Sequence, residues 1–235
     1  MKTLKQILAT GCIVTAMTGC LAGMQACSVT DDNAYGSGHQ VLATAKTLDN
    51  GTFVLQQDKY HMLRPVNILK SPFNDKEVRV IVSYTELGEQ LSTPIYYMDV
   101  NVRNLDSIRT KLPVAATEDW QATYGNDCIE IVDDIINSLY DGYLTLCFST
   151  RWESPSLPHQ VNLITGVNPD DPYEVELCHD ANGDKSGQPI RTLIAFRLDQ
   201  LPLPDDDRKL TLRWKSESGM KTVQFNINRD LLTQN

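Results

Sequence analysis

The chain has 235 residues, a formal net charge of -9 at pH 7 and 41% hydrophobic residues. Nucleic acids and anionic lipid surfaces require clustered lysine and arginine, so this acidic balance argues against both as partners of the folded part. The length is sufficient for one large domain or two small ones.

The first 27 residues have the features of a lipoprotein leader. Lys2 and Lys5 precede an apolar run over residues 7–26, and the run ends at Cys27, which acidic and polar residues follow. A basic start, a short apolar middle and small residues at a cleavage site are typical of a secretory signal. A retained membrane helix is the weaker interpretation, because glycines and polar residues interrupt the run and no basic cluster follows it.

Two cysteines compete for the lipidation site. We prefer Cys27, which leaves an apolar segment of ample length, and keep Cys20 as the alternative. The sequence therefore predicts a leader over 1–27 and a flexible acidic tether over 28–37. Several acyl chains on one cysteine would anchor the protein permanently. We expect a protein held at the outer membrane, facing the cell surface.

Three further cysteines lie in the part of the chain that we expect to fold. Cys128, Cys147 and Cys178 are an odd number, and no spacing pairs two of them, so free thiols are favoured and a single disulfide stays the alternative. Alternation along each expected strand places each cysteine opposite the more apolar side. The chain has no C-x-x-C motif, so a zinc site is not predicted.

Period-two alternation dominates the first half of the remaining chain, and no amphipathic helix of useful length is present. The pair of residues Asn50 and Gly51 tolerates positive φ and predicts a turn between the first two strands. We predict a small OB-like barrel over residues 38–118. Its expected strands are 41–46, 52–57, 78–84, 95–102 and 106–111.

A second set of strands follows a break in the alternation at 115–127. The last hairpin gives the clearest signal, because Leu210, Leu212 and Trp214 alternate with polar residues and would face one core. Frequent turns and short strands predict an antiparallel β-sandwich over residues 119–235. Its expected strands are 128–133, 142–150, 159–165, 173–179, 191–198, 208–216 and 221–228.

Several short segments, in this order, resemble the NigD-like lipoproteins of Bacteroidetes. The segments are 79–87, 96–102, 108–111, 125–131, 142–148 and 179–184. The chain departs from the family pattern near Gln56 to Lys59, at Cys128, where proline is common, and at Asp180, where asparagine is common. The resemblance implies an N-terminal OB-like barrel, a C-terminal β-sandwich and a lipid anchor, and it carries no enzymatic activity.

One loop has a weak pattern for a metal ion. Asp180, Asn182 and Asp184 place three oxygen side chains at alternate positions, as a calcium loop does. Lys185 and Arg191 then occupy the places where an EF-hand requires glycine and glutamate. A tight turn built on Asn182 and Gly183 is the preferred interpretation, and we predict no metal or other cofactor.

No catalytic motif is visible. The four histidines (His39, His61, His159 and His179) are scattered, and none belongs to a recognisable nucleophile motif. The acidic runs at 133–134 and 205–207 adjoin turns and are expected to be solvated. Tyrosines at 60, 84, 96 and 97 could stack on a ligand of the barrel, although packing is the simpler interpretation.

The leading functional hypothesis is a non-enzymatic binding module of the cell envelope. It would contact a protein, a peptide or a glycan through the barrel loops or the cleft between the domains. Two alternatives stay open. One is an immunity or accessory factor linked to a bacteriocin, and the other is a hydrolase whose site is assembled from residues distant in sequence.

Overall fold

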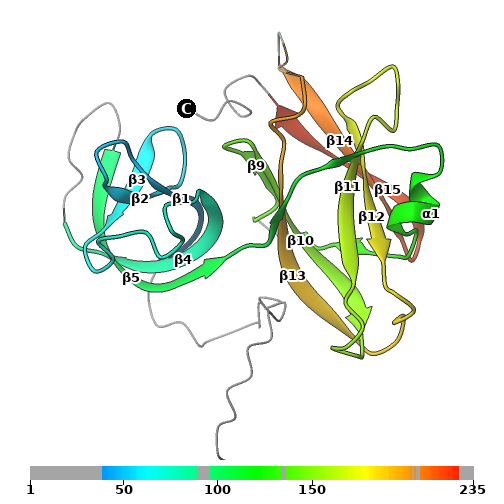
Figure 1. The fold of residues 1–235 in the computed structure, drawn as a ribbon, viewed down its shortest axis with the longest axis horizontal. Helices are drawn as coiled ribbons and strands as arrows, with labels where there is room; N and C mark the ends of the chain where they lie inside the picture. The colour runs from blue at the N-terminus through cyan, green and yellow to red at the C-terminus, as the bar shows by residue number, and fades with distance from the viewer. Residues whose placement is uncertain (1–38, 89–95, 134–135, 203, 205–206, 228–235) are drawn as a thin grey trace, which may run out of the picture.

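The structure is a computed structural model that describes residues 39–88, 96–133, 136–202, 204 and 207–227. The expected leader, the tether, and Cys20 and Cys27 lie outside these residues. Figure 1 shows two β-rich bodies, a small barrel at the left and a larger sandwich at the right. No helix in the described part of the chain is long and apolar enough to cross a membrane.

Five strands form the N-terminal barrel, which closes in the order β1-β2-β3-β5-β4. Only β3 and β5 run parallel; the other neighbours are antiparallel. Alternate side chains point inward, and the buried interior includes Ala43, Ala45, Val80 and Val82. The strands are β1 (His39–Thr47), β2 (Phe53–Gln56), β3 (His61–Pro65), β4 (Val78–Glu86) and β5 (Tyr96–Ser107).

The C-terminal body is a sandwich of two sheets. One sheet has the order β6-β13-β10-β8, with β9 also on β10, and the other has the order β15-β14-β12-β11-β7. Its elements are β6 (Thr110–Lys111), β7 (Val114–Ala115), α1 (Trp120–Tyr124), β8 (Glu130–Ile131), β9 (Ser138–Tyr140), β10 (Tyr143–Trp152), β11 (Gln160–Thr165), β12 (Glu174–Asp180), β13 (Gln188–Arg197), β14 (Arg208–Ser216) and β15 (Gly219–Ile227).

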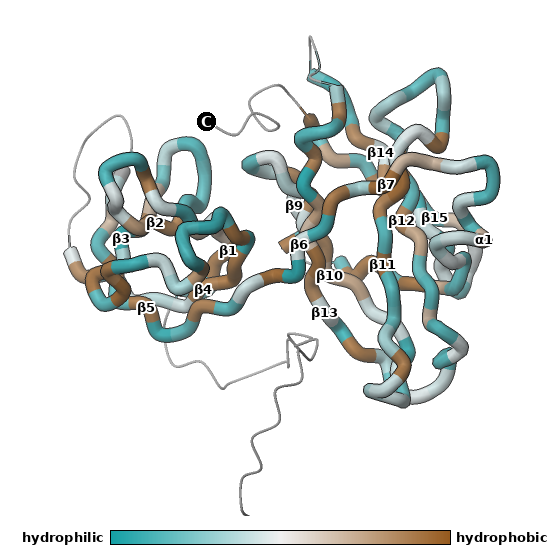
Figure 2. The backbone as a smooth tube through the Cα atoms, in the orientation of Figure 1, coloured by the Kyte–Doolittle hydropathy of each residue, from teal (hydrophilic) through white to brown (hydrophobic). Residues whose placement is uncertain are grey.

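The sandwich core confirms the alternation seen in the last hairpin. Leu210, Leu212 and Trp214 are buried, and they share one cluster with Leu144 and Phe196 of the facing sheet. In Figure 2 hydrophobic residues follow β1 in the barrel and β10 in the sandwich, whereas most connecting loops are hydrophilic. The predicted fold class, a barrel followed by a β-sandwich, is confirmed.

Four details differ from the expectation. The expected strand 106–111 is divided: its start completes β5, while β6 pairs with β13 in the sandwich. The sandwich sheets thus begin at residue 110, before the expected boundary at 118/119. The sequence pattern also missed β3, which is short. Finally, β12 and β14 run parallel, so this sheet is mixed and not purely antiparallel.

The sequence pattern also misses β9, a strand of three residues that lies just before the expected strand 142–150. Tyr140 pairs with Tyr143, and Asp141 and Gly142 between them have φ of 53° and 74°. Two consecutive residues with positive φ are typical of a tight type I′ hairpin, for which Asp-Gly is a preferred sequence. The dipeptide Asp141-Gly142 is therefore the sequence feature from which this hairpin could have been predicted.

Part of the second face of each sandwich sheet is covered and not solvated. Cys147 points away from the sandwich core as expected, yet it is buried in a cluster with Ile81 and Ile108, which precede the sandwich in sequence. Cys178 is buried as well, on the sheet against which α1 packs. Both cysteines and the exposed Cys128 are free thiols, as the sequence favoured.

A buried arginine joins the two bodies. Arg79 of β4 is 1% exposed and donates to Thr44 Oγ1 of β1 at 2.7 Å and to Thr145 Oγ1 of β10 at 3.4 Å. Its guanidinium lies 5.7 Å from the ring centroid of Tyr143. Burial lowers the pKa of Arg79 to about 10. This part of the domain junction is therefore a packed interface and not an open cleft.

Candidate functional site

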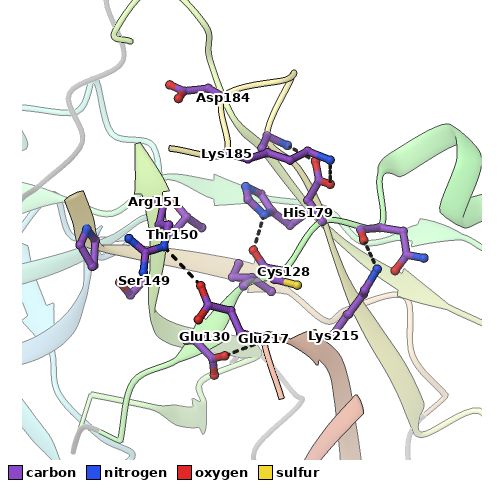
Figure 3. A pocket seen from close by; sticks show the side chains of 15 residues that line it. Cys128, Glu130, Ser149, Thr150, Arg151, His179, Asp184, Lys185, Lys215 and Glu217 are labelled. Atoms are coloured by element: carbon purple, nitrogen blue, oxygen red, sulfur yellow. Dashed lines mark hydrogen bonds and ion pairs between the residues drawn. The ribbon is translucent and has the colours of Figure 1, made fainter. Parts of the chain in front are cut away.

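One pocket of the sandwich has a volume of about 450 Å³ and lies where the two sheets meet at one end. Its lining comes from the segment leading into β8, the second half of β10, and the ends of β12 and β14. Buried Ile129, His179 and Ala181 contribute to it, together with the charged residues Arg151 and Lys215. Figure 3 shows His179, Arg151 and Lys215 extending into this region from separate strands.

Two of the segments that carried the family resemblance meet here. The Asp127 N–H donates to the His179 carbonyl at 2.8 Å, and the Ala181 N–H donates to Asp127 Oδ2 at 3.0 Å. Gly125 has a φ of 91°, and a Cβ at this position would lie 2.4 Å from the His179 oxygen. Segments 125–127 and 179–181 therefore form one wall, and only glycine fits the close approach.

A pair of histidines adjoins this wall, of which His179 is buried and His159 is partly buried. His179 Nδ1 is 2.9 Å from the Cys128 carbonyl oxygen, so this nitrogen carries the proton and donates. His179 Nε2 is 3.0 Å from His159 Nδ1, which then donates to it. Burial lowers the pKa of His179. The two histidines share no sequence motif: His179 lies on β12 and His159 directly precedes β11, and only the fold brings them together.

The residues of the weak calcium pattern, Asp180, Asn182 and Asp184, engage separate partners. Asp184 is buried and accepts from the Glu153 and Ser154 N–H groups, the latter at 2.7 Å. Asp180 Oδ1 instead accepts from the Asn182 N–H. Asn182 and Gly183 have φ of 51° and 85°, as the turn interpretation requires. Among the described residues, no three His, Cys, Asp or Glu side chains are grouped to hold a metal ion.

Charges of both signs surround the opening, and most are paired with each other. The Lys185 ammonium is 2.6 Å from Asp127 Oδ1, and Arg151 Nε is 3.3 Å from Glu217 Oε1. Lys215 Nζ donates to the Asn126 carbonyl at 2.8 Å. Figure 3 marks these contacts with dashed lines.

The ion pair with Lys185 also sets the acidity of Asp127. Burial alone would raise the pKa of this carboxyl, but Lys185 and the Ala181 N–H outweigh it and lower the pKa below its ordinary value.

A pocket whose charges are already balanced suits a polar ligand of low net charge better than an anion or a cation.

A second depression of about 380 Å³ lies on the barrel. The β1–β2 turn, the end of β3 and the following loop line it, with Asp99 of β5. Arg64 binds Asp99 through two parallel hydrogen bonds of 2.6 and 2.8 Å. Beside this pair Val66 and Leu69 are 45% and 79% exposed. The barrel loops thus present exposed apolar side chains next to the ion pair of Arg64 and Asp99.

The other expected ligand contacts are distributed over the molecule. Tyr84 is buried in the barrel core and stacks on His39, as the packing interpretation required, whereas Tyr60 is exposed. His61 lies apart from the histidine pair and contacts Asp58. Asp133 and Asp207 are exposed. The other members of the two acidic runs lie outside the described residues.

A five-stranded closed barrel joined to a two-sheet sandwich defines a two-domain, all-β class of protein. Within that class, residues 42–108 match the NigD-like N-terminal OB domain and residues 112–227 match the NigD-like C-terminal β-sandwich domain. The chain belongs to the NigD-like family, as the short segments predicted. A comparison with curated proteins found no match.

Solved structures agree with this assignment. A toxin-related protein from Parabacteroides distasonis is 26% identical, with a TM-score of 0.64, over 83% of this chain and 96% of the other. A DUF1344 protein of unknown function from Bacteroides vulgatus is 20% identical, with a TM-score of 0.64, over 81% and 91%. A NigD-like immunity protein from Bacteroides caccae is 19% identical, with a TM-score of 0.56, over 84% and 100%.

Proposed function

We propose that this protein is a non-enzymatic binding module of the cell envelope that holds a polar segment of a partner protein in the pocket at the end of the sandwich. The observation that carries the proposal is the pocket itself. Its volume is about 450 Å³, which lies in the usual range for binding sites. Most of its charged side chains are paired with each other, so a peptide segment with amide and hydroxyl groups fits better than a strongly charged ligand.

The state of the nearby nucleophiles supports a binding role over catalysis. Both ring nitrogens of His179 have partners, so this imidazole is not available as the base of a Cys128 thiol. Cys178 is buried, and burial and Glu176 raise the pKa of its thiol to about 12. A thiol of that kind is inert as a nucleophile near neutral pH.

Site-specific photo-crosslinking in intact cells tests the binding role. A photoreactive amino acid at Glu217, on the rim of the pocket, is expected to capture a partner protein. The same group at Lys209, exposed on β14 away from the pocket, serves as the control. Ser149→Trp, which fills the pocket, should abolish the adduct while the melting temperature stays close to that of the parent. Equal capture from both positions would refute the proposed site.

The proposal includes a lipid anchor at Cys27, with Cys20 as the alternative. The basic and apolar start of the chain supports it, and the polar segment 28–37 would place the barrel beyond the membrane surface. Mass spectrometry of the mature protein should find an acylated N-terminal cysteine. Protease treatment of intact cells should degrade the protein if it faces outward. A mature chain that still starts at Met1 contradicts the anchor.

A second candidate function is immunity to a secreted toxin. Two structural relatives are described as toxin-related and as an immunity protein. The acidic balance of this chain would also complement a basic toxin. Sensitive cells that express the protein should survive culture supernatants of bacteriocin-producing strains that kill the parent cells. Equal killing of both would remove this candidate and leave the binding proposal intact.

A further inference from the structure

β15 is a long open sheet edge of the sandwich. The barrel is closed and has no edge, and the edge strands β6, β7 and β8 have two residues each, while β9 has three. β15 has nine residues and pairs with β14 on one side only. In an antiparallel pair the hydrogen bonds alternate, so every second residue of β15 directs its N–H and C=O away from β14.

This edge lacks the devices by which proteins usually prevent strand pairing. The register with β14 runs from Gly219 to Ile227 without a bulge, and the strand has no proline. Its single charge is Lys221, whose ammonium is 3.0 Å from Glu130 Oε2 of β8. Long, regular and nearly uncharged edges pair readily with another strand.

The side chains of β15 divide into two rows. Val223 and Phe225 are half-buried and pack against the sandwich core. Thr222 and Gln224 lie on the opposite face and are exposed. A strand added beside β15 would cover the half-exposed apolar row and would satisfy the outward backbone groups.

We propose that β15 of a second copy of this chain occupies this edge. Val223 is the central residue of β15, so a two-fold axis at Val223 pairs all nine residues of both strands. In this antiparallel register Val223 faces its own counterpart, Lys221 faces Phe225, and Thr222 faces Gln224. No like charges meet, and the apolar row becomes continuous across the two copies. The two five-stranded sheets merge into one.

The association is a weak one that confinement strengthens. Edge pairing of two strands buries less surface than the roughly 1,200–2,000 Å² of a standard stable interface. Tethering to a common membrane would raise the effective concentration of both copies. The test is therefore made in intact cells with the full chain. The proposed pairing of β15 does not depend on the partner of the sandwich pocket, so the two proposals can fail separately.

Disulfide cross-linking reads the register directly. The full chain carries Cys128→Ser, which removes the exposed thiol, together with Val223→Cys. Facing residues in a non-hydrogen-bonded antiparallel pair have Cα atoms about 4.5 Å apart, which a disulfide spans. Mild oxidation of the cells should produce a covalent dimer at least tenfold above the level given by Lys209→Cys, an exposed control on β14. A yield equal to this control overturns the proposal.

Two matched charge variants test the pairing of Thr222 with Gln224. In the Val223→Cys background, Thr222→Lys with Gln224→Lys places like charges opposite each other across the axis and should reduce the dimer at least tenfold. Thr222→Lys with Gln224→Glu places opposite charges there and should keep or increase it. Both positions are exposed, and melting temperatures verify that both variants fold. Equal dimer yields, or an adduct with the mass of a different protein, would overturn a second copy as the occupant.

Discussion

Gly125 shows how one residue without a side chain builds the pocket wall. Its φ is 91° and its ψ is 156°, a backbone conformation that is essentially restricted to glycine, and the His179 carbonyl occupies the place of a Cβ. The hydrogen bond from the Asp127 N–H to that carbonyl depends on this approach. The family segments at this position therefore have an architectural role.

We expect Gly125→Ala to lower the free energy of unfolding by about 3 kcal/mol, since backbone strain and a clash with backbone atoms add together. Gly166→Ala is the matched control, because Gly166 also has a positive φ, 71°, but nothing lies within 4 Å of its added Cβ. That control should lose only about 1 kcal/mol. Urea denaturation measures both, and equal losses would refute the close-approach argument.

The buried His179 predicts a dependence of stability on pH. Burial lowers its pKa in the folded state below the unfolded value of about 6.5. The neutral imidazole thus stabilises the folded protein above about pH 6.5, and this contribution is lost as the pH falls through the folded pKa. Melting temperatures should decline between pH 7.5 and pH 5.

His179→Gln keeps a polar side chain but cannot titrate. Its melting temperature should be lower than that of the parent at pH 7.5, and its further decline towards pH 5 should be smaller. A parallel decline of variant and parent over the same range would show that groups other than His179 dominate the acid response.

At the scale of single elements, α1 depends on its surroundings. A helix of five residues is not stable by itself in water. Asp119 caps it by accepting from the Ala122 N–H at 3.3 Å, and Gln121 Nε2 donates to the buried Glu176 of β12 at 2.7 Å. Glu176 also binds Arg213 at 2.7 Å. The helix thus covers polar groups on the outer face of its sheet.

Asp119→Ala should weaken α1 by about 1 kcal/mol, the usual effect of losing an N-cap. Hydrogen exchange should become faster for the amides of residues 120–124 and stay unchanged in β10 and β13. Glu118→Ala changes the neighbouring carboxylate, which is not the cap, and should leave exchange in α1 as it is. Faster exchange throughout the sandwich would indicate that α1 is part of the global folding unit.

At the scale of the whole molecule, the barrel and the sandwich share a packed junction. Ile81 of the barrel and Ile108 beyond β5 are buried against Cys147, Leu193 and Ala195 of the sandwich. The junction also contains the Arg79 hydrogen bonds and a 2.7 Å bond from the Tyr143 hydroxyl to Glu77. These contacts should hold the two bodies in one orientation.

Thiol labelling measures the integrity of this junction. In a Cys128→Ser background, Cys147 and Cys178 are buried and should react slowly with maleimide. Ile81→Asp places a charge in the junction and should make Cys147 react at least tenfold faster, while Cys178, under α1, stays protected. Phe53→Leu in the barrel core is the control, because it lies away from the junction. Equal acceleration of both cysteines would indicate general unfolding.

The β-rich class, the turns at Asn50-Gly51 and Asn182-Gly183 and the apolar rows of the last hairpin can be predicted from the chain alone, because period-two alternation and turn chemistry are local properties. The family follows from the order of the short segments along the chain. Which faces are covered and which distant residues meet became clear only from the folded arrangement of the strands. Cys147 faces away from its own core, and its burial depends on a barrel residue far away in sequence. His159 and His179 carry no shared motif, and the pairing of β11 with β12 brings them together. Such contacts follow from the global arrangement of strands, which no local pattern encodes.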